Sequence, residues 1–257
     1  MPDDVLSQLV TLSRHLADPA HDYVILGEGN TSARADEETF WVKASGRQMD
    51  GIEADGFVHV RFAPVLGLLE ASDLSDGDVK AELEAARVDP AATSRPSVET
   101  VLHALALQLE GVSFVGHTHP TAVNAILCSQ RAEEAIAGRL FPDEIVVCGP
   151  APAYVPYTDP GLPLARAVCE ALQAHVVEWG EPPKVILMQN HGLIALGRTA
   201  QEVENITAMY VKTARVIIGT YALGGPRFLA AQAVERIHTR PDELYRRRKL
   251  EGQRGGS

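Results

Sequence analysis

The clearest chemical signal in the sequence is a pair of histidines separated by one residue, His117 and His119. In an extended segment residues i and i+2 point to the same side, so both imidazoles can reach one ion. His191 also follows an apolar segment and precedes Gly192, where the backbone can turn sharply. Three neutral imidazoles with an open fourth position are typical of a catalytic zinc ion, so we predict a metal site at these histidines. If only His117 and His119 are considered, the alternative to a metal site is a half-buried strand whose histidines make ordinary hydrogen bonds.

Glu99 is the candidate for the acid/base group beside this site. It follows Ser97 near the start of a predicted helix, where unpaired N–H groups favour a carboxylate, so a purely local role at the helix end is the alternative. His103 lies four residues later and can share a helical face with Glu99. For His103 we favour a structural role over that of a metal ligand.

Two short loops rich in small residues are candidates for binding an anion. They are residues 29–32, with Gly29, Asn30 and Ser32, and residues 44–46, with Ser45 and Gly46. Small residues allow backbone N–H groups and hydroxyls to approach an anion closely, although both sequences are also ordinary turn sequences. Lys43 beside the second loop offers a positive charge, with a solvated lysine at a strand end as the alternative.

The elements that must position these residues alternate between helices and short apolar strands. We expect strands at residues 40–43, 57–62, 112–116, 145–148 and 185–188, and helices at residues 5–16, 98–105, 163–177 and 199–221, with a loop rich in Pro, Tyr and Gly after residue 148. The continuously apolar run 185–188 is typical of a central strand. This order of elements predicts one α/β domain with helices covering a sheet.

Composition and charge argue against several classes of protein. Hydrophobic residues make up 46% of the 257 residues, which is typical of a folded domain. The net charge of −11 disfavours a nucleic-acid binder. No apolar run reaches the roughly 18 residues of a membrane span, and the acidic N-terminus does not resemble a secretory signal, so we expect a cytoplasmic protein without membrane contact. Residues 226–257 are an exception to the acidic balance, because they carry eight basic and four acidic residues.

Read in order, five short motifs resemble those of the class II aldolase/adducin family. They are Gly29-Asn30-x-Ser32, Ser45-Gly46, Pro96-Ser97-x-Glu99, His117-x-His119-Pro120 and Asn190-His191-Gly192-Leu193. The family contains the aldolases of fuculose phosphate and rhamnulose phosphate, and ribulose-phosphate 4-epimerase. The resemblance covers about residues 5–222 and implies a three-layer αβα fold on a mostly antiparallel sheet. It also implies a homotetramer with active sites between neighbouring subunits, built from a domain of residues 1–225 with residues 226–257 as a basic helical extension of it.

The resemblance also implies a role for each candidate residue. His117, His119 and His191 would bind one Zn²⁺ per subunit, with another divalent metal as the alternative, and Glu99 would be the acid/base. Asn30 would be a second catalytic group, and the residues matching the phosphate and enediolate site are Gly29, Asn30, Ser45, Gly46 and Ser97. Val98 stands where the fuculose enzymes have a second serine. A tyrosine lent by a neighbouring subunit would be Tyr210, Tyr221 or Tyr245.

The implied reaction is cleavage of a carbon–carbon bond in a ketose phosphate or a related hydroxy-ketone, through an enediolate stabilised by the metal. The substrate would then be a small molecule similar to a sugar phosphate. The same metal site is also suited to epimerisation, dehydration or decarboxylation. The alternative to an enzyme is a non-catalytic, adducin-like interaction module. That hypothesis predicts loss of the histidines, and all three are present.

Overall fold

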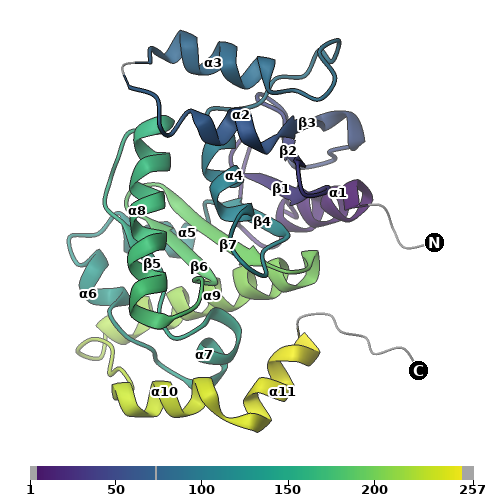
Figure 1. Cartoon of the computed structure of the whole chain (residues 1–257). Coiled ribbons are helices and arrows are strands. Elements are labelled where there is room, and N and C mark those ends of the chain that lie inside the picture. The colour runs from purple at the N-terminus through teal and green to yellow at the C-terminus, as the bar shows by residue number, and fades with distance from the viewer. Residues whose placement is uncertain (1–4, 73, 251–257) are drawn as a thin grey trace, which may run out of the picture.

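Seven strands form one sheet in the order β3-β2-β1-β4-β7-β6-β5 (Figure 1). The structure is a computed structural model that describes residues 5–72 and 74–250. The strands are β1 (Asn30–Arg34), β2 (Thr39–Lys43), β3 (Phe57–Arg61), β4 (Phe114–Thr118), β5 (Ala153–Val155), β6 (Val185–Met188) and β7 (Gly192–Gly197). Neighbouring strands are antiparallel except β5 and β6, which are parallel. The sheet is therefore mixed, which corrects the expectation of a mostly antiparallel sheet at the β5 edge.

Helices cover both faces of the sheet, which gives the three-layer arrangement that the family resemblance implied (Figure 1). One layer contains α2 (Phe62–Gly67), α3 (Asp76–Ala85), α4 (Thr100–Leu107) and α8 (Leu162–Trp179). The other contains α1 (Val5–Leu16), α5 (Thr121–Leu127), α6 (Ala132–Ile136), α7 (Pro142–Cys148) and α9 (Ala200–Tyr221). Helix α8 connects β5 to β6, and a parallel pair requires such a long crossover.

The central strands contribute to two hydrophobic cores because successive residues of a strand point to opposite faces. In β7, Ile194 and Leu196 lie in the core under α4 and α8, whereas Leu193 and Ala195 lie in the core under α9. Strand β6 is buried along its whole length. Burial on both faces explains why residues 185–188 are continuously apolar.

The strand predicted at residues 145–148 is wrong, because these residues form most of helix α7. Pro142 stands in the first turn of α7, and Asp143 and Glu144 follow it. Proline and acidic residues in this order are typical of a helix N-terminus, and a short apolar run does not distinguish a strand from a buried helix. The strand of this region is β5, which lies in the segment expected to be a loop.

The C-terminal segment contains α10 (Ala231–Thr239) and α11 (Pro241–Leu250), and both helices pack against α7. Arg246 of α11 pairs with Asp143 of α7, with 2.7 Å between Nη2 and Oδ1. Residues 251–257 of the basic tail, which include Arg254, lie outside the described residues.

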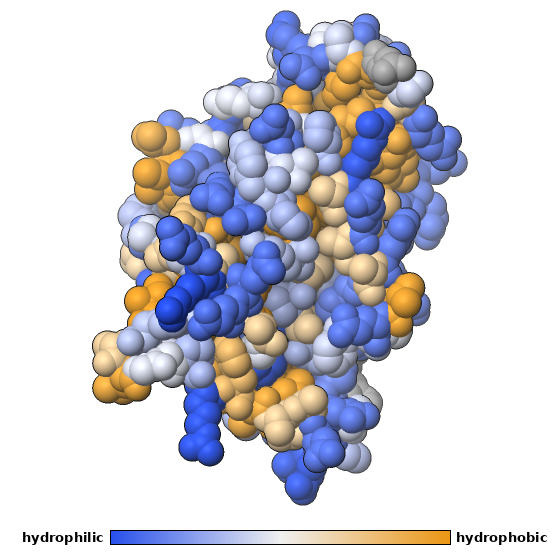
Figure 2. All heavy atoms as spheres, turned by 90° about the vertical axis from the view of Figure 1, so that its left-hand side faces the viewer, coloured by the Kyte–Doolittle hydropathy of each residue, from blue (hydrophilic) through white to orange (hydrophobic). Residues whose placement is uncertain are grey.

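The molecular surface on the side of α6 and α8 shows several apolar patches separated by hydrophilic residues (Figure 2). Val177 of α8 is 87% exposed, and Trp179 at the end of the same helix is partly exposed. Scattered exposed apolar residues are ordinary on a folded domain. No helix among the described residues has the length and hydropathy needed to cross a membrane.

A buried ion pair joins Arg139, just before α7, to Glu144 in the first turn of that helix. Arg139 and Glu144 are each about 1% exposed, and Arg139 Nη1 lies 3.0 Å from Glu144 Oε1. Arg139→Met leaves the Glu144 carboxylate buried without its cation, so we expect the free energy of unfolding to fall by about 3–5 kcal/mol. Urea unfolding followed by circular dichroism measures this change.

The matched control is the exposed pair between Arg47 and Asp55, since loss of a surface ion pair changes stability by about 1 kcal/mol or less. Arg47→Met should therefore unfold close to wild type. The double variant Arg139→Met/Glu144→Leu should recover most of the loss, because apolar residues can replace a buried pair. Equal stability of Arg139→Met and wild type would contradict the prediction that the buried Glu144 carboxylate needs the Arg139 cation.

Candidate metal centre

Three histidines converge at one end of the sheet, where β4 ends and β7 begins. His117 lies on β4, His119 follows that strand directly, and His191 precedes β7, the neighbour of β4. One ring nitrogen from each of the three lies within 4.8 Å of the others. Among the described residues, no other group of three or more potential ligands comes together in this way.

The orientation of His117 and His119 suits a metal ion. His117 Nδ1 donates to the carbonyl oxygen of Leu193 at 3.0 Å, which leaves the Nε2 lone pair free. This Nε2 lies 3.0 Å from His119 Nε2. Two ligands of one zinc ion, each bonded at about 2.0–2.1 Å, have a similar separation. The donor set therefore fits a divalent metal.

The surroundings of the histidines fix their positions further. The carbonyl of Tyr23 accepts from the His119 backbone N–H at 2.9 Å, and Asn124 Nδ2 donates to the His191 carbonyl at 3.0 Å. Glu28 Oε1 lies 3.9 Å from His119 Nδ1, on the side of the ring away from His117. Carboxylates behind metal-ligating histidines commonly hold their orientation. Sequence reasoning did not assign a role to Glu28 or Asn124, since neither belongs to a recognisable ligand pattern.

Two glycines allow the backbone to pass close to the histidines. A Cβ atom at Gly192 would lie 2.6 Å from the Thr118 carbonyl oxygen and 2.7 Å from a carbon of the His119 ring. Gly29 has a φ of +65°, and a Cβ there would lie 2.6 Å from the His117 carbonyl oxygen. The sequence predicted a sharp turn at Gly192, but the left-handed residue is Asn190, with φ of +54°. Gly192 is required for close packing instead.

Glu99 turns its carboxylate toward the histidines. Its Oε1 lies 3.3 Å from His191 Nε2 and 3.8 Å from His117 Nε2. Although Glu99 occupies the N-cap position of α4, its side chain makes no capping hydrogen bond, so the local role does not account for it. Burial raises the pKa of Glu99, but the nearby His117 and His191 and hydrogen bonds from His191 and Asn30 outweigh burial and hold the pKa well below its usual range.

Asn30 connects Glu99 to a buried histidine. The register of the sheet places Asn30 directly opposite His117. Asn30 Nδ2 donates to Glu99 Oε2, and its Oδ1 accepts from His103 Nε2. His103 is fully buried and lies outside the group of three histidines, in agreement with the structural role favoured for it. Burial lowers the pKa of His103 to about 4, so this ring is neutral at pH 7.

The loop predicted at residues 29–32 is wrong for most of its length, because Asn30 and Ser32 lie on strand β1. The Ser45 N–H donates to the Arg95 carbonyl at 2.8 Å, which ties the loop containing Gly46 to the segment that carries Ser97. Ser97 Oγ is buried and has no hydrogen-bond partner among the described residues. Lys43 is buried, with Nζ donating to the Arg47 carbonyl at 2.5 Å, so it is not the solvated lysine of the alternative. Burial lowers the pKa of Lys43, and the charge of Glu99 opposes this.

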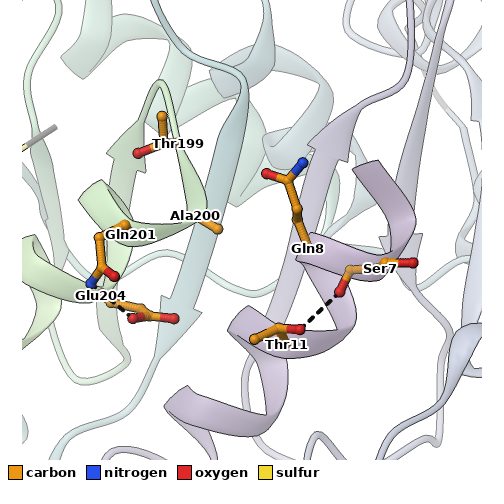
Figure 3. A pocket seen from close by; sticks show the side chains of 7 residues that line it. All are labelled: Ser7, Gln8, Thr11, Thr199, Ala200, Gln201 and Glu204. Atoms are coloured by element: carbon orange, nitrogen blue, oxygen red, sulfur yellow. Dashed lines mark hydrogen bonds between the residues drawn. The ribbon is translucent and has the colours of Figure 1, made fainter. Parts of the chain in front are cut away.

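A separate polar groove of about 480 Å³ lies between α1 and the first turns of α9 (Figure 3). It is lined by Ser7, Gln8, Thr11, Thr199, Ala200, Gln201 and Glu204. Strand β7 begins beside His191 and ends just before α9, so the groove is about a strand length, roughly 17 Å, from the histidines. Its lining contains no group of metal ligands, so the chemistry is concentrated at the histidines.

The buried histidines make the stability of the metal-free protein depend on pH. Burial lowers the pKa of His103 and of His117 to about 4, and that of His119 to about 3. The unfolded histidines titrate near pH 6.5, so between pH 6.5 and 4 the unfolded chain binds protons that the folded chain does not. We therefore expect the free energy of unfolding to fall as the pH falls through this window, with His103 alone contributing about 3 kcal/mol.

Urea unfolding of chelator-treated protein at pH 7, 5.5 and 4.5 measures this effect. His103→Gln should show a flatter dependence on pH than wild type because glutamine does not titrate. Leu107→Ala, a buried change on the same helix that removes no titratable group, is the control and should keep the wild-type dependence on pH. A pH dependence of His103→Gln equal to that of wild type would disprove the assignment to His103.

The sequence matches the model of the class II aldolase and adducin N-terminal domain over residues 7–218. A curated relative, the uncharacterized oxidoreductase YuxG of Bacillus subtilis strain 168, is 28% identical over 199 residues. That match covers 74% of this chain and 25% of YuxG, so the chain spans about a quarter of the length of this relative.

Solved structures show the same fold. The N-terminal class II aldolase domain of a conserved protein from Thermoplasma acidophilum has a TM-score of 0.67 and 26% identity, over 85% of this chain and 95% of that chain. An L-fuculose 1-phosphate aldolase has a TM-score of 0.68 and 16% identity, over 93% of this chain and 96% of that chain. Because the family model covers most of the sequence, the chain belongs to the class II aldolase and adducin family.

Proposed function

We propose that this protein is a zinc-dependent aldolase that cleaves a ketose phosphate or a related hydroxy-ketone. The observation that carries the proposal is the position of Glu99, which has one carboxylate oxygen near His117 and His191 and the other bonded to Asn30. The solved L-fuculose 1-phosphate aldolase supports the proposal through its fold. The retained histidines argue against a non-catalytic adducin-like module.

In the proposed mechanism His117, His119 and His191 would hold one zinc ion, which would supply Lewis-acid polarisation of the substrate carbonyl. Glu99 Oε1 moves the proton on and off the enediolate carbon. Asn30 Nδ2 carries two hydrogens, of which one is bonded to Glu99, so the second is available to the developing enediolate oxygen. Gly29, Ser45, Gly46 and Ser97 bind the phosphate or other distal group, and the unpartnered Ser97 hydroxyl supports this role.

We also propose that the protein is a homotetramer with its active sites between subunits. Residues 1–225 would form the catalytic domain, with residues 226–257 as an extension of it. Tyr210 is buried beside Arg139 in the chain's own core, so it is not the tyrosine lent to a neighbour. Tyr245 of α11 is 62% exposed, and we propose this residue for that role.

The test is a screen for aldehyde release from a panel of ketose 1-phosphates and unphosphorylated hydroxy-ketones, with and without a chelator. We expect release from at least one substrate, loss of activity in the chelator and recovery on adding Zn²⁺. Nuclear magnetic resonance of the same reactions detects epimerised, dehydrated or decarboxylated products. Such a product without aldehyde would replace the aldolase assignment, and protein without stoichiometric divalent metal would favour the interaction module.

A further inference from the structure

The ring of His103 in α4 joins two side chains of the neighbouring strand β1. His103 Nδ1 lies 2.7 Å from the Ser32 hydroxyl oxygen, and Nε2 is hydrogen-bonded to the Asn30 amide oxygen. Asn30 and Ser32 are two residues apart on one strand, so their side chains point to the same side. The ring is fully buried, and both ring nitrogens are used within this chain of polar groups.

The partners determine which atoms donate in this chain. The Glu99 carboxylate only accepts, so the Asn30 amide must turn Nδ2 toward it and Oδ1 toward His103. Because Oδ1 accepts, His103 Nε2 carries the hydrogen of that bond, and in the neutral ring Nδ1 accepts from the Ser32 hydroxyl. The amide orientation and the tautomer are thus assigned from the network of donors and acceptors. The hydrogen bonds run in one direction from Ser32 through His103 and Asn30 to Glu99.

We propose that His103 is a positioning residue that holds the Asn30 amide in place, with Nδ2 directed toward Glu99 and the substrate. Without a donor behind it, Oδ1 loses its bond to His103, and the single bond from Nδ2 to Glu99 no longer fixes the position of the amide. A displaced amide does not present its second Nδ2 hydrogen where the reaction needs a donor. The kinetic part of this inference rests on the proposed function, whereas the orientation of Asn30 is a structural statement that does not require turnover.

The kinetic test compares His103→Met with His103→Gln. Methionine fills the site without a ring donor, whereas the glutamine amide both donates and accepts. On the ketose phosphate that wild type cleaves fastest, we expect His103→Met to lower kcat by about 10- to 100-fold with little change in KM. His103→Gln should recover kcat to within about threefold of wild type. Zinc content should stay at the wild-type level in both variants, because neither removes a ligand.

A double-mutant cycle distinguishes positioning from a general loss of structure. If His103 acts through Asn30, His103→Met should have no further effect on kcat in an Asn30→Ala background. Leu107→Ala, a buried change on the same helix, is the control that should lower stability and leave kcat close to wild type. Wild-type kcat in His103→Met, or a full additional loss on top of Asn30→Ala, would overturn the inference.

Crystal structures of wild type and His103→Met give the readout that does not need an activity. We expect the Asn30 side chain to be displaced or disordered in His103→Met and to keep its wild-type position in His103→Gln. If wild type cleaves nothing in the panel, the proposed function fails, while the orientation of Asn30 still decides this inference. If His103→Met does not fold, Ser32→Ala takes its place, and an unchanged Asn30 orientation together with unchanged kcat would overturn the proposal.

Discussion

Glu99→Gln is expected to lower kcat for cleavage by about 1,000-fold while zinc stays bound. A general acid/base contributes roughly 10²–10⁴-fold, and an amide of the same shape does not accept a proton from carbon. The three histidine ligands are unchanged, so the metal site remains. Steady-state kinetics and metal analysis of the same preparation measure the two quantities together.

The matched control for this variant is Glu204→Gln. Glu204 is a partly buried carboxylate in the polar groove between α1 and α9, away from His117, His119 and His191 (Figure 3). The same chemical change at that position should leave kcat within about twofold of wild type, as expected for a site without contact with substrate. Full activity of Glu99→Gln would remove the acid/base role from Glu99, and loss of zinc in that variant would show that Glu99 is needed as a ligand.

His119→Ala is expected to abolish both metal binding and activity. Loss of an outer partner of a metal ligand already lowers metal affinity by about 10–100-fold, so loss of a ligand itself should lower it by more than about 100-fold. Competition with a fluorescent zinc chelator measures this affinity without reference to any substrate. We expect no measurable aldehyde release from the variant at a zinc concentration that saturates wild type.

His59→Gln is the control for the loss of a histidine elsewhere in the sheet. His59 lies on β3 and stacks on Trp41, with 4.2 Å between ring centroids, away from the converging histidines. The His59→Gln variant should bind zinc as tightly as wild type. If His119→Ala retained wild-type affinity, the metal would have to be held by other residues, and the proposed centre would be wrong.

Local patterns in the sequence were sufficient for part of the site. The i, i+2 spacing of His117 and His119 predicted two imidazoles on one side of a strand end, and the structure has them there. The apolar runs predicted most strands, but the apolar run in α7 led to a wrong strand because burial on all sides gives the same pattern in either element. Strand β7 was not predicted, although its first residue follows His191.

What the sequence determined by itself was the set of residue types and their local spacing. Three histidines, a glutamate after Ser97 and two loops of small residues were enough to indicate metal chemistry and the family. These features are local, because side chains return to the same face every two residues in a strand and about every 3.6 residues in a helix. This repeat does not depend on the rest of the chain.

Only the tertiary structure decided how these pieces meet. Asn30 lies opposite His117 because of the register between β1 and β4, and Glu99 reaches His191 because α4 packs over the sheet. Register depends on contacts between residues far apart in the chain, which local periodicity does not contain. For the same reason the role of His103 was not visible in the sequence, since its partners Asn30 and Ser32 are about seventy residues away.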